Sequence, residues 1–355
     1  MKLNIAVLPG DGIGPEVTEQ AVKVTAAVCS KNGHEVTFSH GLIGAAAIDA
    51  VGSPYPEKTH ELCMGSGAVL FGAIGDPRYD NDPGARQRPE KGLLSMRSRL
   101  GLYANLRPVK SIQALYHKSP LREDIIKGVD FVAVRELTGG IYFGRPQGRS
   151  EDGDTAYDTC IYHRHEIERI SRLAFDLAGK RRGKLCMVDK ANVLATSRLW
   201  REVVQKLSGE YPGVDTEYMF VDNAAMQLIQ WPGRFDVILT ENMFGDILTD
   251  EASVITGSLG MLPSASIGKH TSVFEPIHGS YPQAAGKDTA NPLAAVLSAA
   301  LMFEYAFKMP REAEMIVKAA ESSVGAGVVT EDMGGAAKSR TSEVGDWLVK
   351  YIEGL

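Results

Sequence analysis

The sequence predicts an α/β protein in which helices cover a central sheet. Short apolar runs, typical of strands, alternate with longer segments whose apolar residues recur at helical spacing. The 355 residues, 44% of them hydrophobic and 23% charged, are enough for one large or two ordinary globular domains. The net charge of −6 gives no indication of a nucleic-acid-binding surface.

The amino-terminal segment predicts a buried strand followed by a helix. Residues 3–8 (LNIAVL) form a compact apolar run that ends at Pro9-Gly10, which favours a strand over a signal peptide. Pro15 fits the first turn of the helix, and Gly33 closes it. The segment GDGIGP resembles a dinucleotide-binding Gly-x-Gly-x-x-Gly fingerprint, but Pro15 occupies the last glycine position. A Rossmann domain is therefore not expected, although these glycines permit close approach of a ligand.

The remaining elements are predicted from the same signals. Strands are expected at residues 36–38, 68–71, 131–135, 141–143, 185–188, 216–221 and 236–240. Helices are expected at residues 197–207, 292–307, 312–324 and 342–352. No apolar run approaches the ~20 residues needed to cross a bilayer. The four cysteines, none in a CxxC pair, predict reduced thiols in a cytosolic protein.

A pair of aspartates is the strongest local indication of a functional site. Asp246 and Asp250 are four residues apart in GDILTD, which places them on one helix face, ~5–6 Å apart at Cβ. Two like charges at this spacing repel unless a cation lies between them, and their oxygens suit a hard divalent cation. Ile247 and Leu248 are expected to pack between the acids. The alternative is that both acids stabilise the amino end of a helix through its dipole. Asp222 is a third candidate ligand, or a helix cap.

Several basic residues are candidates for binding a small dicarboxylate. They are Arg97, Arg99, Arg107 and Arg135. Guanidinium groups bind carboxylates bidentately, although any one of these arginines could instead lie on a solvated face. Arg107 is expected in a turn before Pro108, and Arg135 at a strand end, where α/β proteins build their sites.

Three further segments could contribute to catalysis or binding. Lys190 follows an apolar strand and could act as a base near a metal, or lie in solvent at a helix start. Tyr142 could donate a proton, or be a packed strand aromatic. A Gly-rich loop that contains His278 and Asn291 could hold a nucleotide through backbone amides and side-chain hydrogen bonds.

Motifs in order along the whole chain resemble those of the isocitrate/isopropylmalate dehydrogenase family of β-decarboxylating enzymes. They are LPGDGIGPE, PEKGLLSMR, ANLRP, RELTGGIYFG, VDKANVL, FVDNAAM, ENMFGDILTDE, GSLGMLPSAS, FEPIHGS and ANP. The resemblance implies that family's two-domain α/β fold with a central mixed sheet, which is not a Rossmann fold. It implies a discontinuous cofactor-binding domain (residues 1–104 and 255–355) and a metal, substrate and dimerisation domain (residues 105–254). It also implies a homodimer whose active site is shared across the interface.

The resemblance also implies roles for individual residues. The catalytic residues are Tyr142, which protonates the enol, and Lys190 of the partner subunit, which helps to deprotonate the hydroxyl. The ligands of Mg²⁺ or Mn²⁺ are Asp246, Asp250 and, from the partner subunit, Asp222. The substrate contacts Arg97, Arg107, Arg135, Asp222, Glu90, Leu93, Leu94 and Val193. NAD contacts Ile13, Gly75, Glu90, Glu275, His278, Gly279, Ser280, Gln283, Ala284 and Asn291.

The implied reaction is NAD-dependent oxidation of a 2-hydroxy acid followed by loss of CO₂. Leu93 and Leu94 offer an apolar wall beside Arg97, which favours 3-isopropylmalate, whose product is the leucine precursor 4-methyl-2-oxopentanoate. Isocitrate would place an unpaired carboxylate against this wall. Homoisocitrate and tartrate- or malate-type substrates are alternatives. A catalytically silent paralogue is another, but all the matched catalytic positions are present.

One position departs from the family pattern. Gln283 stands where NAD-dependent members usually have Asp, which bonds the adenosine ribose. Gln can still bond a ribose but does not repel a 2′-phosphate. The Lys-Tyr pair of NADP-dependent relatives is absent, so NAD remains the expected cofactor.

Overall fold

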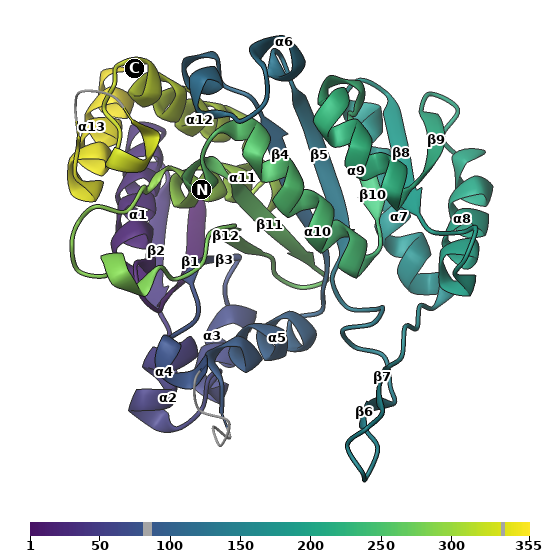
Figure 1. The fold of residues 1–355 in the computed structure, drawn as a ribbon. Helices are drawn as coiled ribbons and strands as arrows, with labels where there is room; N and C mark the ends of the chain where they lie inside the picture. Colours follow the sequence, from purple (N-terminus) through teal and green to yellow (C-terminus); the bar gives the residue numbers. More distant parts are fainter. Residues whose placement is uncertain (81–86, 335–337) are drawn as a thin grey trace. The chain divides into compact units, whose positions relative to one another are not determined.

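The computed structural model describes residues 1–80, 87–334 and 338–355 (Figure 1). The chain forms two compact units: unit 1 comprises Met1–Leu102 and Ser258–Leu355, and unit 2 comprises Tyr103–Gly257. The family resemblance implied boundaries after residues 104 and 254.

Unit 1 is built on five strands in the order β2-β1-β3-β12-β11. They are β1 (Lys2–Gly10), β2 (Glu35–His40), β3 (Ala68–Ala73), β11 (Pro263–Gly268) and β12 (Val273–Pro276). β1 pairs in parallel with β2 and β3, β12 pairs in parallel with β3, and β11 runs antiparallel to β12. Every residue of β3 is buried, which explains its continuous apolar sequence. The mixed pairing differs from the all-parallel Rossmann sheet, as expected.

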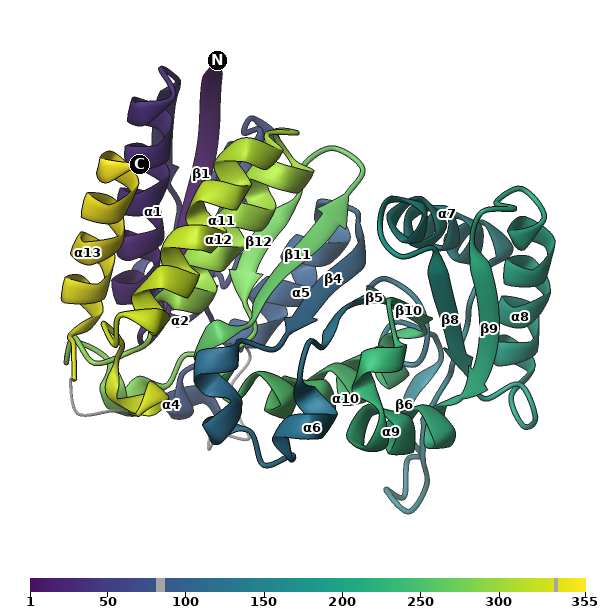
Figure 2. The ribbon, with the colours of Figure 1, turned by 90° about the horizontal axis from the view of Figure 1, so that it is seen from above.

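The helices of unit 1 surround these strands. They are α1 (Gly14–Lys31), α2 (Gly44–Val51), α3 (Glu57–Met64), α4 (Pro77–Asp80), α5 (Pro89–Arg99), α11 (Leu293–Tyr305), α12 (Pro310–Gly325) and α13 (Thr341–Gly354). Figure 2 shows α11 and α12 lying across strands β11 and β12, with α13 beside α1. α11 is buried on nearly all sides because it packs on the strands, α1 and α12 together.

Unit 2 carries strands in the order β4-β5-β10-β8-β9. They are β4 (Leu102–Lys110), β5 (Asp130–Glu136), β8 (Lys184–Asp189), β9 (Asp215–Phe220) and β10 (Val237–Thr240). β4 is antiparallel to β5, and the other four strands are parallel. Helices α7 (Arg164–Lys180) and α8 (Ala195–Ser208) pack together on one face, and α9 (Val221–Gln230) and α10 (Asn242–Ser253) on the other (Figure 2). β6 (Gln147–Arg149) and β7 (Ala156–Asp158) form a separate hairpin.

Three local expectations are wrong. Residues 141–143 form a turn rather than a strand, because Gly140 has a φ of 76° and its carbonyl accepts the Gly144 N–H at 2.9 Å. The expected turn before Pro108 lies inside β4, where Pro108 stands opposite Val132. Ile247 does not pack between the aspartates, because its side chain is 61% exposed and only Leu248 is buried.

Two further observations concern membrane-spanning helices and the cysteines. Within residues 1–80, 87–334 and 338–355, no helix is both long and apolar enough to cross a membrane. All four cysteines are free, as expected. Burial raises the pKa of Cys29 and of Cys63 to about 11, which keeps these two thiols protonated and unreactive.

Candidate active site

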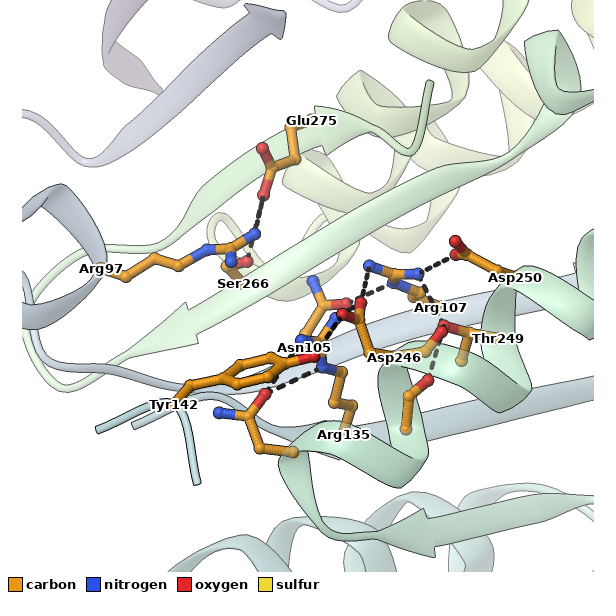
Figure 3. A network of polar contacts seen from close by, with 12 residues as sticks. Arg97, Asn105, Arg107, Arg135, Tyr142, Asp246, Thr249, Asp250, Ser266 and Glu275 are labelled. Atoms are coloured by element: carbon orange, nitrogen blue, oxygen red, sulfur yellow. Dashed lines mark hydrogen bonds and ion pairs between the residues drawn. The ribbon is translucent and has the colours of Figure 1, made fainter. Parts of the chain in front are cut away.

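Two arginines on neighbouring strands of unit 2 face the first turns of α10 (Figure 3). Arg135 stands opposite Asn105 in the β4–β5 register, and Arg107 is two residues further along β4, so all three lie on one face. Arg135 is 3% exposed and Arg107 is 9% exposed. A guanidinium buried to this degree must be paired, because leaving its charge uncompensated costs several kcal/mol.

The predicted aspartates of α10 provide this pairing. Arg135 forms an ion pair with Asp246 through Nη1. Arg107 Nη1 lies 3.1 Å from Asp250 Oδ1, and its Nη2 lies 3.9 Å from Asp246 Oδ1. Arg107 Nη1 also donates to Thr249 Oγ1 at 2.6 Å. Both aspartates therefore occupy one side of α10, where the guanidinium groups of Arg107 and Arg135 neutralise their charges.

Tyr142 joins this network through its hydroxyl. It donates a hydrogen bond of 2.9 Å to Asp246 Oδ2, and its side chain is 42% exposed. Partial burial and the hydrogen bond to Asp246 both raise the pKa of the phenol. Tyr142 is therefore protonated near neutral pH and can donate a proton.

A supporting group of residues, which the sequence analysis did not identify, orients Arg135. Asn242 Oδ1 accepts hydrogen bonds from Arg135 Nη2 at 2.9 Å and from Nε at 3.2 Å. The Asn242 backbone N–H donates to the Tyr162 hydroxyl at 2.9 Å, which fixes the start of α10. A Cβ on Gly245 would lie 2.6 Å from Arg135 Cγ, so glycine lets α10 approach the arginine closely. The position of Asn242 just after β10 was an available signal, because polar residues at strand ends build sites in α/β proteins.

Lys190 and Asp222 form a second charged group in unit 2. Lys190 follows β8, Asp222 lies in the first turn of α9, and the two side chains form an ion pair. The hydrogen bond from Lys190 holds the pKa of Asp222 below its ordinary value. Val193, in the following turn, is 61% exposed. In the described part of a single chain, no group of three or more His, Cys, Asp or Glu side chains could hold a metal ion.

In unit 1, one face of α5 carries the predicted substrate residues. Glu90, Leu93, Leu94 and Arg97 follow the spacing i, i+3, i+4, i+7, which aligns them along the helix. Arg97 Nη2 lies 3.6 Å from Glu275 Oε1, and both side chains are at least 85% buried (Figure 3). Leu94 remains 44% exposed. This face therefore combines an anion-binding group with uncovered apolar surface.

The fourth candidate arginine is engaged elsewhere. Arg99, also on α5, donates to both carboxylate oxygens of Glu57 at 2.7 and 2.8 Å. It follows Leu94 by five positions, so it lies off the face that carries Leu93 and Arg97. Arg99 therefore fits the alternative raised for these arginines, a place on a solvated face away from the candidate site.

Two of the predicted cofactor segments meet at Gly75. A Cβ built on Gly75 would lie 3.3 Å from Glu90 Oε1 and 3.4 Å from Ser280 Oγ. The Gly75 N–H donates to Asp11 Oδ2 at 3.0 Å, so the carboxylate of Asp11 holds this segment in place. Ile13 N donates to Ser280 O at 2.8 Å, which ties the segment after β1 to the predicted cofactor loop.

That loop lines a cavity of about 310 Å³ in unit 1. The lining residues are Ile13, Leu259, Gly260, His278, Gly279, Tyr281, Thr289, Ala290, Asn291 and Asp332. Four of them were predicted to contact the cofactor: Ile13, His278, Gly279 and Asn291. Gln283 is exposed and outside this lining, while Ala284 is buried. The sequence analysis did not identify Asp332, which follows a segment that carries no family motif.

His278 is the chemically distinctive side chain of the cavity. Its Nδ1 lies 3.0 Å from the Gly279 carbonyl oxygen. Its Nε2 is buried and has no hydrogen-bond partner among the described residues. Burial lowers the pKa of His278, so the ring is neutral near physiological pH. A buried polar atom without a partner is costly unless a ligand satisfies it.

Comparison with known proteins gives a consistent result. Residues 4–348 match the isocitrate/isopropylmalate dehydrogenase family. The chain is 56% identical over 354 residues to a 3-isopropylmalate dehydrogenase of Bacteroides fragilis, with 99% of each chain covered. It is 57% identical over 333 residues to that of Geobacillus kaustophilus, covering 93% of this chain and 90% of the relative.

Solved structures extend the likeness to the fold. An isocitrate dehydrogenase from Methylococcus capsulatus is similar with a TM-score of 0.87, 33% identity and 99% of each chain covered. A beta-decarboxylating dehydrogenase from Thermococcus kodakarensis is similar with a TM-score of 0.81 and 36% identity, over 99% of this chain and 96% of that one. The chain therefore belongs to the isocitrate/isopropylmalate dehydrogenase family and is an oxidoreductase of that family.

Proposed function

We propose that this protein oxidises and decarboxylates 3-isopropylmalate to 4-methyl-2-oxopentanoate, a step of leucine biosynthesis, in the cytoplasm. The observation that carries the proposal is the face of α5, where Leu93 and the half-exposed Leu94 accompany Arg97. An isopropyl group suits this apolar surface, whereas the third carboxylate of isocitrate would lose its hydration against the two leucines. Relatives named 3-isopropylmalate dehydrogenase support the same substrate.

The arginines bind the two substrate carboxylates in this proposal. Arg107 and Arg135 are held by Asn105, Thr249 and Asn242, so their guanidinium planes are oriented before any ligand arrives. The two arginines and their two aspartates sum to zero charge. A dianionic substrate and a divalent cation can therefore enter together without adding net charge to a partly buried site.

The side chains on α10 fit a divalent metal ion. Asp246 and Asp250 offer carboxylate oxygens, the ligands that Mg²⁺ and Mn²⁺ prefer, and their side chains are 37% and 71% exposed. Asp222 of a partner subunit would complete the set. When bound, such an ion would supply Lewis-acid stabilisation of negative charge on the substrate oxygens.

The proton steps are assigned to Lys190 and Tyr142. Lys190 is assigned as the base for the substrate hydroxyl in the partner's site. Only its neutral amine can accept that proton, so the ion pair with Asp222 would have to open first. Tyr142, protonated and hydrogen-bonded to Asp246, would return a proton to carbon after CO₂ is lost. The two residues thereby divide the acid and base roles between different elements.

The cavity in unit 1 is the proposed binding site for NAD, which supplies the hydride acceptor when bound. Its volume of about 310 Å³ suits the adenosine end of a dinucleotide rather than the whole molecule. The unpartnered His278 Nε2 is available to bond such a ligand. Asn291 also lines the cavity, with its side-chain amide held by Asp332 and by the Leu293 N–H.

A homodimer is supported by exposed apolar side chains around α9 and α10. Met226 is 53% exposed, Ile229 37%, Ile247 61% and Val254 38%. A second copy of the chain would remove this apolar surface from water. The same two helices carry Asp222, Asp246 and Asp250, so dimerisation through them would complete the proposed metal site.

Steady-state oxidation of 3-isopropylmalate and isocitrate, each with NAD and with NADP, tests the proposal. We expect turnover of 3-isopropylmalate with NAD that depends on Mg²⁺ or Mn²⁺ and stops on chelation. Turnover confined to isocitrate, homoisocitrate or a malate-type acid would replace the substrate assignment, and equal activity in a chelator would refute the role of the metal.

A further inference from the structure

The cofactor loop of unit 1, residues 278–291, contains three residues with a left-handed backbone conformation. Two non-glycine residues in it have left-handed conformations, Tyr281 with φ 38° and Asp288 with φ 56°, and Gly286 has φ 75°. Left-handed backbone is unfavourable for residues with a Cβ and persists only where the surroundings enforce it. The loop therefore needs contacts that hold it, and these come from α1 and α13.

The first contact is the carboxylate of Glu16, in the first turn of α1. Its Oε1 accepts the N–H of Gly286, and its Oε2 accepts the N–H of Asp288 at 3.1 Å. One carboxylate thus spans the two left-handed residues on either side of Lys287. Ile13, three positions before Glu16, donates its N–H to Ser280 O at 2.8 Å. The start of α1 therefore holds both ends of the loop.

The second contact comes from the start of α13. The carboxylate of Asp288 accepts the Ser342 N–H at 2.8 Å and the Ser342 hydroxyl at 2.6 Å. The buried Thr341 donates its hydroxyl to Ala290 O at 2.6 Å and its N–H to Asp288 O at 3.0 Å. Asp288 is therefore fixed from both sides, by Glu16 at its N–H and by α13 at its carboxylate and carbonyl.

We propose that Glu16 is a positioning residue for cofactor binding, which acts by holding Gly286 and Asp288 so that the cavity wall formed by Thr289, Ala290 and Asn291 is preformed. This inference rests on the proposed function, because it takes the cavity to be the cofactor site. Glu16 is not among the residues that line the cavity, so it acts through the loop. Holding a loop in its bound conformation raises affinity by removing the entropic cost of ordering it on binding.

Three substitutions weaken the contacts of the loop to different degrees, and a fourth serves as a control. Glu16→Ala removes both, and Glu16→Gln leaves one acceptor without the charge. Ser342→Ala weakens the hold on Asp288 from α13 without touching α1. Glu19→Gln is the matched control, because Glu19 is exposed on the same helix and has no hydrogen bond or ion pair within the described residues.

Two measurements on the full-length protein test the proposal. Hydrogen exchange of the Gly286 and Asp288 amides, without cofactor, reports the loop directly, and calorimetric titration with NAD reports affinity. We expect exchange to accelerate and the Kd for NAD to rise about tenfold in Glu16→Ala, with smaller rises in Glu16→Gln and Ser342→Ala. kcat at saturating NAD should stay within about twofold of the starting protein, and Glu19→Gln should change nothing.

Unchanged exchange or unchanged NAD affinity in Glu16→Ala would overturn the proposal. So would a fall in kcat and melting temperature that matches the loss of affinity, since that indicates general damage. Faster exchange in Glu16→Ala, in a protein whose starting form does not bind NAD, would refute the proposed function and the cofactor role of Glu16 while leaving the contact itself real.

Discussion

Two regions of the molecule differ in how their polar groups are paired: the network on α10 in unit 2, and the cavity beside the cofactor loop in unit 1. The first gathers two buried arginines and two aspartates, each charge balanced by another. The second keeps its histidine neutral and leaves one polar nitrogen, His278 Nε2, without a partner among the described residues. The charged side chains of the first region are paired with one another, whereas the second region has a buried hydrogen-bonding atom that is free to bind a ligand.

This difference predicts how each region responds to a ligand. Ligands of the charged network must exchange partners with ion pairs that already exist, so each side chain there is coupled to several others. A ligand of the cavity can bond His278 Nε2 without breaking an existing hydrogen bond. Substitutions in unit 2 should therefore have large, non-additive effects, and those around the cavity should be modest and separable.

The largest expected effect is on Asp246. Asp246→Asn removes the charge that Arg135 and Tyr142 share and weakens the proposed metal site. We expect turnover to fall by about three orders of magnitude or more, since metal-ion catalysis supplies several kcal/mol. Metal titration and steady-state kinetics measure this, with the exposed Asp176→Asn as the control. Turnover within tenfold of the starting protein would refute a central role for Asp246.

A mixing experiment tests whether the second charged group of unit 2 serves another subunit. Lys190→Ala and Tyr142→Phe homodimers should each be nearly inactive. After the two are refolded together, random pairing gives half heterodimers with one intact site each, or about a quarter of full activity. Each homodimer refolded alone is the control. No recovery in the mixture would mean that Lys190 and Tyr142 of the same chain act together in one active site.

A smaller effect is expected at Glu241, a buried acid of unit 2 that, in the described part of the chain, has no cationic partner. Burial raises its pKa from 4.5 to about 7, although Ser197 donates a hydrogen bond to it. The folded protein then binds this proton more tightly than the unfolded chain. Stability should fall as pH rises from 4.5 to 7, by about 3 kcal/mol at most.

Glu241→Gln keeps an acceptor for Ser197 and removes the titration. Denaturant unfolding of both proteins at several pH values between 4.5 and 8 checks the prediction. The variant should have a flatter profile and greater relative stability at pH 8. Parallel profiles would mean that Glu241 is hydrated or paired in solution.

The smallest effect is expected at Gln283, on the exposed side of the cofactor loop. Gln283→Asp should leave turnover with NAD near its starting value and lower residual turnover with NADP by about three- to tenfold, because a carboxylate repels a 2′-phosphate. Gln283→Asn, which adds no charge, is the control. If the starting protein prefers NADP, then a basic residue distant in sequence reaches this position.

Much of the fold followed from local signals. The apolar runs of β1, β3, β5, β8 and β10 and the periodic segments of α1, α8, α11, α12 and α13 lie where the sequence predicted them, to within a few residues. β4 was missed because Asn105, Arg107 and Pro108 interrupt its apolar pattern. These residues are tolerated because the arginine and asparagine bond each other and α10. A local pattern cannot register a polar strand residue whose partner lies more than a hundred positions away.

The sequence by itself determined which residue types the site contains: the spacing of Asp246 and Asp250, the leucines before Arg97, and the motif order that identifies the family. Only the tertiary structure decided which charges meet. It paired Arg135 with Asp246, placed Asn242 behind the arginine, and set Glu16 against the cofactor loop. Helical periodicity is a property of neighbouring residues, whereas pairing of buried charges depends on which distant elements pack together and on how little water remains between them.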